Sequence, residues 1–258
     1  MYQRNVAQHG DALKLLRSLP NRCTPLVFFD PQHREVMNKL KFGNEGARQK
    51  GRFKLPAMTS DYIDTCCREA ARVLRPSGYV MQWADTFQLC EAYHKRIADV
   101  LQSVDLIVWD NLRPSMGKRS RRRGGYVLVL QKEPIVAGAT WSNHSICDRW
   151  PEKIDRKLHP HIKPIGLISA LIGAVTKPGD LVVDPAAGSF VVMRAARELG
   201  RDFIGCDLAM RRDKRRRCVE CEVHWADPPL ALCPGCQAGT WWSANPPRCD
   251  ERVDQGHL

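Results

Sequence analysis

Short apolar segments alternate with amphipathic ones along most of the chain. Apolar residues at positions 12, 13, 15, 16 and 19 predict a short helix over residues 12–19, with Asp11 as its N-cap. Residues 25–29 (PLVFF) predict a buried strand that ends at Asp30. The next stretch, residues 34–58, is polar and basic and contains several glycines, which favours a long functional loop.

The same alternation continues through the rest of the first 210 residues. We expect helices over residues 60–74, 86–102, 164–176 and 190–199, and strands over residues 79–83, 104–109, 126–130, 180–184 and 202–207. Residues 134–163 predict an irregular segment. Because strands and helices alternate, the fold class is predicted to be α/β, a doubly wound Rossmann-like sheet with helices on both faces.

The character of the chain changes near Arg211. Residues 211–258 are rich in Cys, Pro and Trp, show no helical periodicity and are too few to form an apolar core without a staple. The sequence therefore predicts a main domain over residues 1–210 and a small appendage over residues 211–258.

Composition narrows the class of protein. The 258 residues are 43% hydrophobic and 26% charged, which is typical of a soluble globular chain. No apolar run reaches the about 18 residues of a transmembrane helix, and the N-terminus lacks the apolar region of a secretory signal. We expect a cytoplasmic protein without a membrane partner. Eleven cysteines in such a chain suggest reduced thiols or metal ligands rather than disulfides.

Most of the net charge of +12 comes from two short runs. Residues 118–123 (KRSRRR) and residues 211–217 (RRDKRRR) carry a net charge of +5 each. Concentrated positive charge is typical of nucleic-acid binding. The alternative is solvated surface charge that aids solubility.

Residues 180–190 (DLVVDPAAGSF) have the pattern of a ligand-binding loop. An apolar strand ends in an acidic residue and is followed by a turn of small residues and a helix. Ligands bind open α/β sheets at the carboxyl ends of strands, where small residues and exposed helix N–H groups allow close approach. Asp207 follows the next strand and can accept hydrogen bonds from the ribose of a nucleoside cofactor. An ordinary structural corner is the alternative, and the glycine spacing disfavours NAD and ATP.

Together with this loop, the segment before it resembles the cofactor half of amino-type (N6-adenine/N4-cytosine) DNA methyltransferases. The resemblance rests on residues 159–207, which contain HPHIKP and DPAAGSF, and on the order of three N-terminal segments: Gly10-Asp11, LVFFDPQH at 26–33 and RVLRPSG at 72–78. It covers roughly residues 5–210. It implies S-adenosylmethionine as cofactor, DNA as partner and the exocyclic amine of a base as methyl acceptor.

The resemblance also implies roles for individual residues. The turn around the methionine portion of the cofactor would be formed by Asp184, Pro185, Ala187, Gly188 and Ser189. Asp207 would hold the ribose and Asp11 the adenine amino group, although Asp11 can equally be a simple helix cap. The methionine end would be supported by His159, Lys163 and Pro164, with a purely structural role for His159 and Lys163 as the alternative.

The methyl-transfer motif is expected at residues 30–33 (DPQH), directly after the first strand. The Asp30 carboxylate and the Pro31 carbonyl can accept the two N–H hydrogens of an amine, and an aromatic ring at His33 can stack on a flipped base. An aspartate at the first position matches adenine-N6 enzymes better than cytosine-N4 enzymes. Gln32, His33 and Phe190 depart from the family pattern of Pro, a larger aromatic residue and Gly.

The appendage carries two pairs of cysteines with metal-ligand spacing. Cys218 and Cys221 form one CxxC pair, and Cys233 and Cys236 form the second after an interval of eleven residues. Four thiolates with no open position predict a structural zinc site that resembles a zinc ribbon, with free thiols or disulfides as the alternative.

We therefore expect an S-adenosylmethionine-dependent DNA methyltransferase that acts on adenine N6. Residues 34–58, residues 113–125 and the zinc appendage are predicted to contact DNA, and a homodimer is possible. Two alternatives stay open. One is a nucleic-acid-binding protein on a catalytically impaired scaffold, and the other is methylation of cytosine N4 or of RNA.

Overall fold

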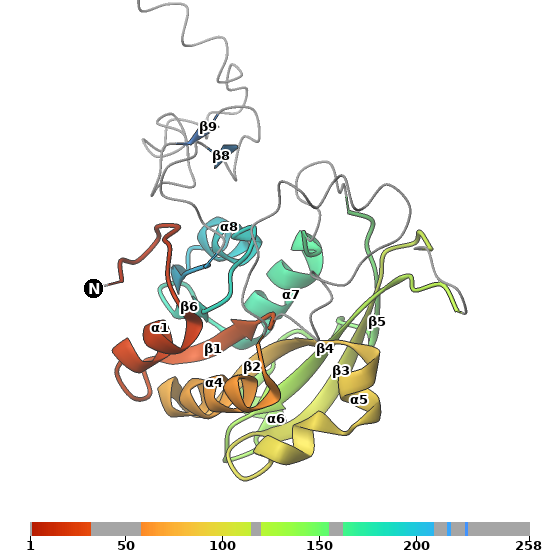
Figure 1. The fold of residues 1–258 in the computed structure, drawn as a ribbon, viewed down its shortest axis with the longest axis horizontal. Coiled ribbons are helices and arrows are strands. Elements are labelled where there is room, and N and C mark those ends of the chain that lie inside the picture. Colours follow the sequence, from red (N-terminus) through yellow and green to blue (C-terminus); the bar gives the residue numbers. More distant parts are fainter. Residues whose placement is uncertain are drawn as a thin grey trace, which may run out of the picture.

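The computed structural model describes residues 2–31, 58–114, 120–154 and 162–208, and the backbone of residues 216–217 and 225–226. Within these ranges the main feature is a seven-stranded sheet in the order β5-β3-β4-β2-β1-β6-β7 (Figure 1). Its strands are β1 (Thr24–Phe29), β2 (Leu74–Ala84), β3 (Gln102–Asp110), β4 (Gly124–Gln131), β5 (Arg149–Pro151), β6 (Leu181–Asp184) and β7 (Asp202–Gly205).

The sheet is mixed rather than wholly parallel. Strand β4 runs antiparallel to both of its neighbours, β2 and β3, whereas every other adjacent pair is parallel. Strands β3 and β4 follow each other in the chain and pair antiparallel, as the two strands of a β-hairpin do. The predicted α/β class is confirmed, with this one reversal in strand direction.

Helices cover both faces of the sheet, as the alternation predicted (Figure 1). The helical elements are α1 (Ala12–Ser18), α4 (Ser60–Val73), α5 (Thr86–Cys90), the 3-10 helix η1 (Tyr93–Ile97), α6 (Ala137–Thr140), α7 (Ile165–Val175) and α8 (Val191–Glu198). Successive residues of β1 face opposite sides, so Leu26 and Phe28 pack with α7 and α8, and Val27 and Phe29 pack with α1 and α4. All four side chains are buried, which explains why the strand reads as a continuous apolar run.

Two sequence-based boundaries were wrong. The single helix expected over residues 86–102 is instead α5 followed by η1, because Ala92 adopts a left-handed conformation (φ 50°, ψ 43°) that interrupts the helix. The segment over residues 134–163 is not wholly irregular, since it contains α6 and β5. Strand β5 adds the outer edge of the sheet by pairing with β3.

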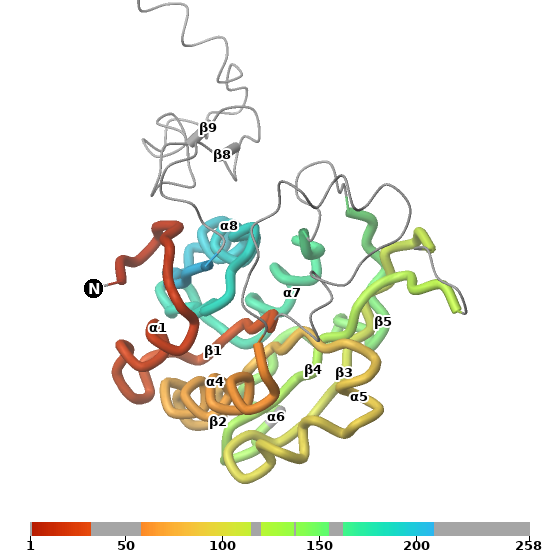
Figure 2. Tube along the Cα trace, viewed as in Figure 1, coloured from red at the N-terminus to blue at the C-terminus, as the bar shows by residue number. Residues whose placement is uncertain are grey.

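The N-terminal segment lies against the last described strand of the main sheet. In Figure 2 the red N-terminal chain runs beside the blue segment that includes β7. The backbone N–H of Gly10 donates to the carbonyl of Asp207 at 3.3 Å, and the N–H of Asp207 donates to the carbonyl of Gln8 at 3.1 Å. These contacts bring Asp11, which is the residue after Gly10, toward the carboxyl end of β7.

Little of the predicted appendage lies within the described residues. Two short strands, β8 (Arg216–Arg217) and β9 (Trp225–Ala226), pair antiparallel and flank in sequence the segment that contains Cys218 and Cys221. The division at residue 210 stays a prediction. Across the described ranges, no helix is long and apolar enough to cross a membrane.

Candidate functional site

Two loops predicted to carry the chemistry follow neighbouring strands. Strand β1 lies between β2 and β6 and is parallel to both, with Val27 opposite Val183. The carboxyl ends of β1 and β6 therefore meet at one edge of the sheet, with Asp30 after β1 and Asp184 at the end of β6. The negative charge of Asp30 contributes to the raised pKa of Asp184.

The loop after β6 makes a tight turn and has free space next to Gly188. The N–H of Ala186 donates to Asp184 Oδ1 at 3.2 Å, and the N–H of Ala187 donates to the carbonyl of Cys206 at 3.0 Å. Gly188 has a φ of +51°, and a Cβ built there would meet no atom within 4 Å. The tight turn is thus held by Cys206, directly after β7, and there is free space next to Gly188.

Phe190 lies at the end of this loop, at the position where the family pattern has Gly. It is the N-cap of α8 and has a left-handed backbone (φ 58°, ψ 25°), which is costly for a residue with a bulky side chain. Its ring is 2% exposed and packs edge-to-face on Phe203, with 6.4 Å between ring centroids. The side chain is therefore accommodated beneath the loop, within the core.

Asp207 and Asp11 lie near the loop after β6, and each accepts hydrogen bonds from neighbouring segments. Asp207 Oδ2 accepts the N–H of Gly188 at 2.9 Å, so this carboxylate holds the loop after β6. Asp11 is a helix cap, because its Oδ1 accepts the N–H of Lys14 at 3.0 Å. Its second oxygen, Oδ2, accepts the hydroxyl of Tyr62 at 2.7 Å. The structural alternative for Asp11 is thus observed, and its contact with adenine stays a prediction.

Three aspartates, Asp30, Asp184 and Asp207, interact electrostatically at this end of the sheet. Burial raises the pKa of Asp184 well above its ordinary value, and the charges of Asp30 and Asp207 raise it further. The N–H of Ala186 and the ammonium of Lys163 act in the opposite direction. A ligand that carries positive charge next to these residues would relieve their mutual repulsion.

Lys163 contacts the predicted transfer motif. Its Nζ lies 2.9 Å from Asp30 Oδ2 and 4.2 Å from the centroid of the Trp83 ring. The two side chains of the ion pair are 23% and 36% exposed, so solvent screens the pair only in part. Trp83 is at the carboxyl end of β2, is 4% exposed and packs edge-to-face on Trp109.

Not every predicted site residue can be placed. Pro31 directly follows Asp30 and is buried, Pro164 is the N-cap of α7, and Pro185 and Ser189 lie in the loop after β6. The following predicted residues lie outside the described ranges: Gln32, His33, His159, Cys218, Cys221, Cys233 and Cys236. Cys66, Cys67 and Cys206 are buried free thiols, as expected for core cysteines.

Two residues at this site were missed at the sequence level. Trp83 supports Lys163, and Tyr62 donates to Asp11 from the first turns of α4. Trp83 could have been found, because it ends a predicted strand and the carboxyl ends of parallel strands meet at one edge. Tyr62 had no such signal, since its partner is 51 residues away in the sequence.

The fold and the two loops define the class of protein. The structure resembles the M1.HpyAVI–SAM complex (TM-score 0.55, 19% identity, 78% of this chain and 92% of that chain). It also resembles the PvuII DNA methyltransferase, described as cytosine-N4-specific (TM-score 0.57, 19% identity, 78% of this chain and 81% of that chain). At this level of identity the likeness establishes a shared α/β methyltransferase fold.

Sequence comparison establishes the family. The profile of the N6_N4_Mtase family, described as DNA methylase, matches residues 42–212. The Type II methyltransferase M.HhaII of Haemophilus parahaemolyticus is 41% identical over 216 residues, which span 83% of this chain and 95% of that protein. The DNA adenine methyltransferase YhdJ of Escherichia coli (strain K12) is 26% identical over 239 residues, 78% of this chain and 77% of that protein. The chain belongs to the N6_N4_Mtase family of DNA methylases, and the resemblance noted in the sequence is confirmed.

Proposed function

We propose that this chain is an S-adenosylmethionine-dependent DNA methyltransferase that methylates adenine N6. The observation that carries the proposal is the placement of Asp30 and the loop of residues 184–189 at the ends of adjacent parallel strands. A methyl donor held by one loop and an amine held by the other would meet at one edge of the sheet.

The residues of the loop after β6 fit the cofactor. The space over Gly188 admits a ligand next to the backbone, and the carboxylates of Asp184 and Asp207 suit a molecule that carries positive charge. When bound, S-adenosylmethionine supplies an electrophilic methyl group. In the proposal, Asp184 and the backbone of residues 185–189 hold its methionine portion, and Asp207 holds its ribose.

An exocyclic base amine is a poor nucleophile because its nitrogen lone pair is conjugated with the ring. The acceptor side of the site must therefore make this lone pair available. Asp30 and the carbonyl of Pro31 accept the two N–H hydrogens and hold the nitrogen lone pair toward the donor. The nitrogen gains a methyl group and gives up a proton, which the carboxylate of Asp30 can accept. His33 is proposed to stack on the flipped base.

Lys163 is proposed to position Asp30 rather than to contact the cofactor. Its ammonium is 2.9 Å from Asp30 Oδ2 and lies over the face of Trp83 at 4.2 Å from the ring centroid. A charge-assisted hydrogen bond of this kind fixes the orientation of a carboxylate. The carboxylate is then oriented before the base arrives, which is the purpose of preorganisation in a catalytic site.

Two considerations support adenine as the base. Aspartate at the first position of the transfer motif matches adenine-specific members better, and the relative YhdJ is named as an adenine methyltransferase. The full-length protein should be incubated with S-adenosylmethionine and duplex DNA, and the nucleosides then analysed by mass spectrometry. We expect N6-methyladenine. N4-methylcytosine would overturn the base assignment, and bound DNA and cofactor without product would favour an impaired scaffold.

The role of Asp30 is tested in the same assay. Asp30→Asn keeps the size of the side chain but removes its charge, and should lower the rate of methylation about 10²–10⁴-fold. Asp105→Asn on β3 is the matched control, because this exposed aspartate lies outside the site. An active Asp30→Asn variant would contradict the proposed role.

A further inference from the structure

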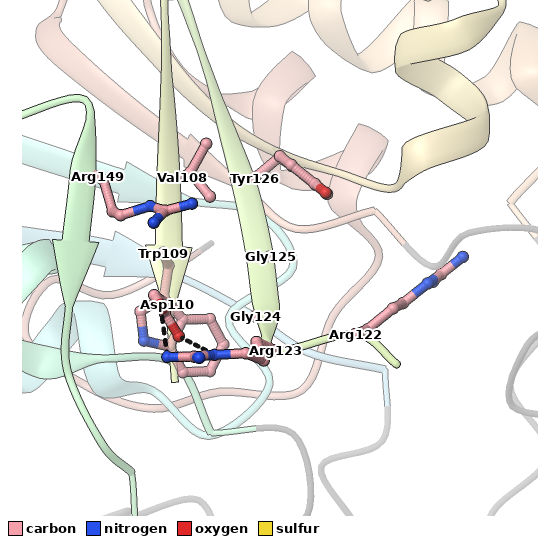
Figure 3. Close-up of a pocket in the computed structure, with 9 residues that line it drawn as sticks. All are labelled: Val108, Trp109, Asp110, Arg122, Arg123, Gly124, Gly125, Tyr126 and Arg149. Carbon is pink, nitrogen blue, oxygen red and sulfur yellow. Dashed lines mark hydrogen bonds and ion pairs between the residues drawn. The ribbon is translucent and has the colours of Figure 1, made fainter. Parts of the chain in front are cut away.

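A basic groove opens at the end of the β3–β4 hairpin, outside the site described above (Figure 3). It is formed by the last residues of β3, the first residues of β4 and the segment before them, and the start of β5. Its lining residues are Val108, Trp109, Asp110, Arg122, Arg123, Gly124, Gly125, Tyr126 and Arg149.

The charges in this groove are only partly neutralised. Asp110 is the one carboxylate of the lining and is bound by Arg123 through two hydrogen bonds, Nε to Oδ1 at 3.0 Å and Nη2 to Oδ2 at 2.9 Å. The N–H of Leu112, Arg123 and the nearby Arg149 all hold the pKa of Asp110 below its ordinary value. With three arginines and one charged aspartate, the groove carries a net positive charge of two.

Arg122 and Arg149 supply this excess. Arg122 donates to the Thr86 hydroxyl at 3.0 Å and lies over the ring of Phe87 at 5.9 Å, and neither partner is charged. In Figure 3 Arg122 points away from Asp110, whereas Arg123 folds back onto it. Arg149 is exposed at the start of β5, opposite Val108 of β3. Both guanidinium groups are therefore available to an anion.

The groove lies at the same edge of the sheet as the transfer site. Strands β1, β2 and β3 run in the same direction, so Asp110 at the end of β3 and Asp30 after β1 lie at one edge. Three strand spacings of about 4.8 Å separate β3 from β1, a distance of about 14 Å. Duplex DNA carries one negative charge per about 1.7 Å of its axis, so about eight phosphates fall within that length.

We propose that this groove binds phosphate groups of the DNA duplex next to the acceptor base, with Arg122 and Arg149 as the phosphate ligands. The inference rests on the proposed function, since it takes the DNA substrate as the occupant. Guanidinium groups match phosphate oxygens in two-point geometry. Gly124 and Gly125 let β4 pack closely on its neighbours at this end of the hairpin, since a Cβ on Gly124 would lie 1.7 Å from the carbonyl oxygen of Trp109. Asp110 holds Arg123 in place and limits the positive charge.

The test is the salt dependence of DNA binding. Arg122→Gln, Arg149→Gln and the double variant should be compared with the wild type by fluorescence anisotropy on one duplex between 50 and 200 mM salt. Each phosphate contact contributes about 0.9 to the slope of log K against log salt, so the double variant should lose about 1.8 from the slope. Arg68→Gln is the control, because Arg68 is also an exposed arginine, lies on α4 and pairs with Asp99.

Asp110→Asn tests the same groove in the opposite direction. It keeps an oxygen that can accept the N–H of Leu112, removes the negative charge and releases Arg123, so DNA should bind more tightly and with a steeper slope. Thermal melts of each variant report folding. If the wild type methylates DNA and the slopes of all variants match the wild type, the groove is not a phosphate site and the proposed function stands. If the wild type neither binds nor methylates DNA, both fail.

Discussion

Lys163 offers the sharpest test of how the site is organised. The resemblance to known enzymes implies support for the methionine end of the cofactor, whereas the structure places the ammonium 2.9 Å from Asp30 and over Trp83. Lys163→Met removes the charge and keeps a flexible apolar side chain against the ring. A role in cofactor binding predicts a weaker Kd for S-adenosylmethionine, whereas a role in positioning Asp30 predicts a slower methyl-transfer step.

The size of the effect follows from the two contacts. The ion pair is partly exposed, so it is worth at most about 1 kcal/mol. The cation–π contact adds about 0.5–1 kcal/mol. A total of about 0.5–2 kcal/mol, if lost from the orientation of Asp30 in the transition state, lowers the methyl-transfer rate about 2- to 30-fold.

The assay separates binding from chemistry. Single-turnover methylation at saturating DNA and cofactor measures the transfer step, and calorimetric titration measures the Kd for S-adenosylmethionine. We expect a slower transfer step with a Kd within about twofold of the wild type. Lys95→Met is the control, because Lys95 is exposed on η1.

The opposite pattern would refute this reasoning. An unchanged single-turnover rate together with a weakened Kd for the cofactor would return Lys163 to the cofactor side of the site. An unchanged rate and an unchanged Kd would show that neither role holds.

Two further predictions concern the loop after β6. Because burial raises the pKa of Asp184 above 3.8, the wild type is most stabilised below that pH and loses this contribution as pH rises through the raised pKa. Asp184→Asn should therefore gain thermal stability relative to the wild type from pH 4 to pH 8 without cofactor; a difference that does not change with pH would contradict this. Phe190→Gly relieves about 1 kcal/mol of left-handed strain but loses about 3–5 kcal/mol of buried packing, so urea unfolding should show a net loss of about 2–4 kcal/mol. Phe190→Ala keeps the strain and should be about 1 kcal/mol less stable than Phe190→Gly, and a glycine variant as stable as the wild type would mean that strain outweighs packing.

Local sequence patterns predicted most of the helices and strands, because the formation of each helix or strand depends mainly on residues that are neighbours in the chain. The apolar run at residues 25–29 is buried on both faces as β1, and the side chain of Asp11 caps α1. The break at Ala92 was not predicted, because the apolar spacing continues past it and an alanine gives no signal for a left-handed conformation. Strand β5 was too short, at three residues, to show a period.

The sequence by itself determined the alternation of strands and helices and the loop of small residues after β6, and it predicted the transfer motif after β1. Each of these is a local pattern of side-chain size and polarity, and local physics is enough to specify it. Only the tertiary structure decided that Lys163, Asp30 and Trp83 meet, and that Arg149 joins the end of the β3–β4 hairpin. Those contacts join segments far apart in the chain, and the order and direction of the strands, set by packing of the whole sheet, bring them together.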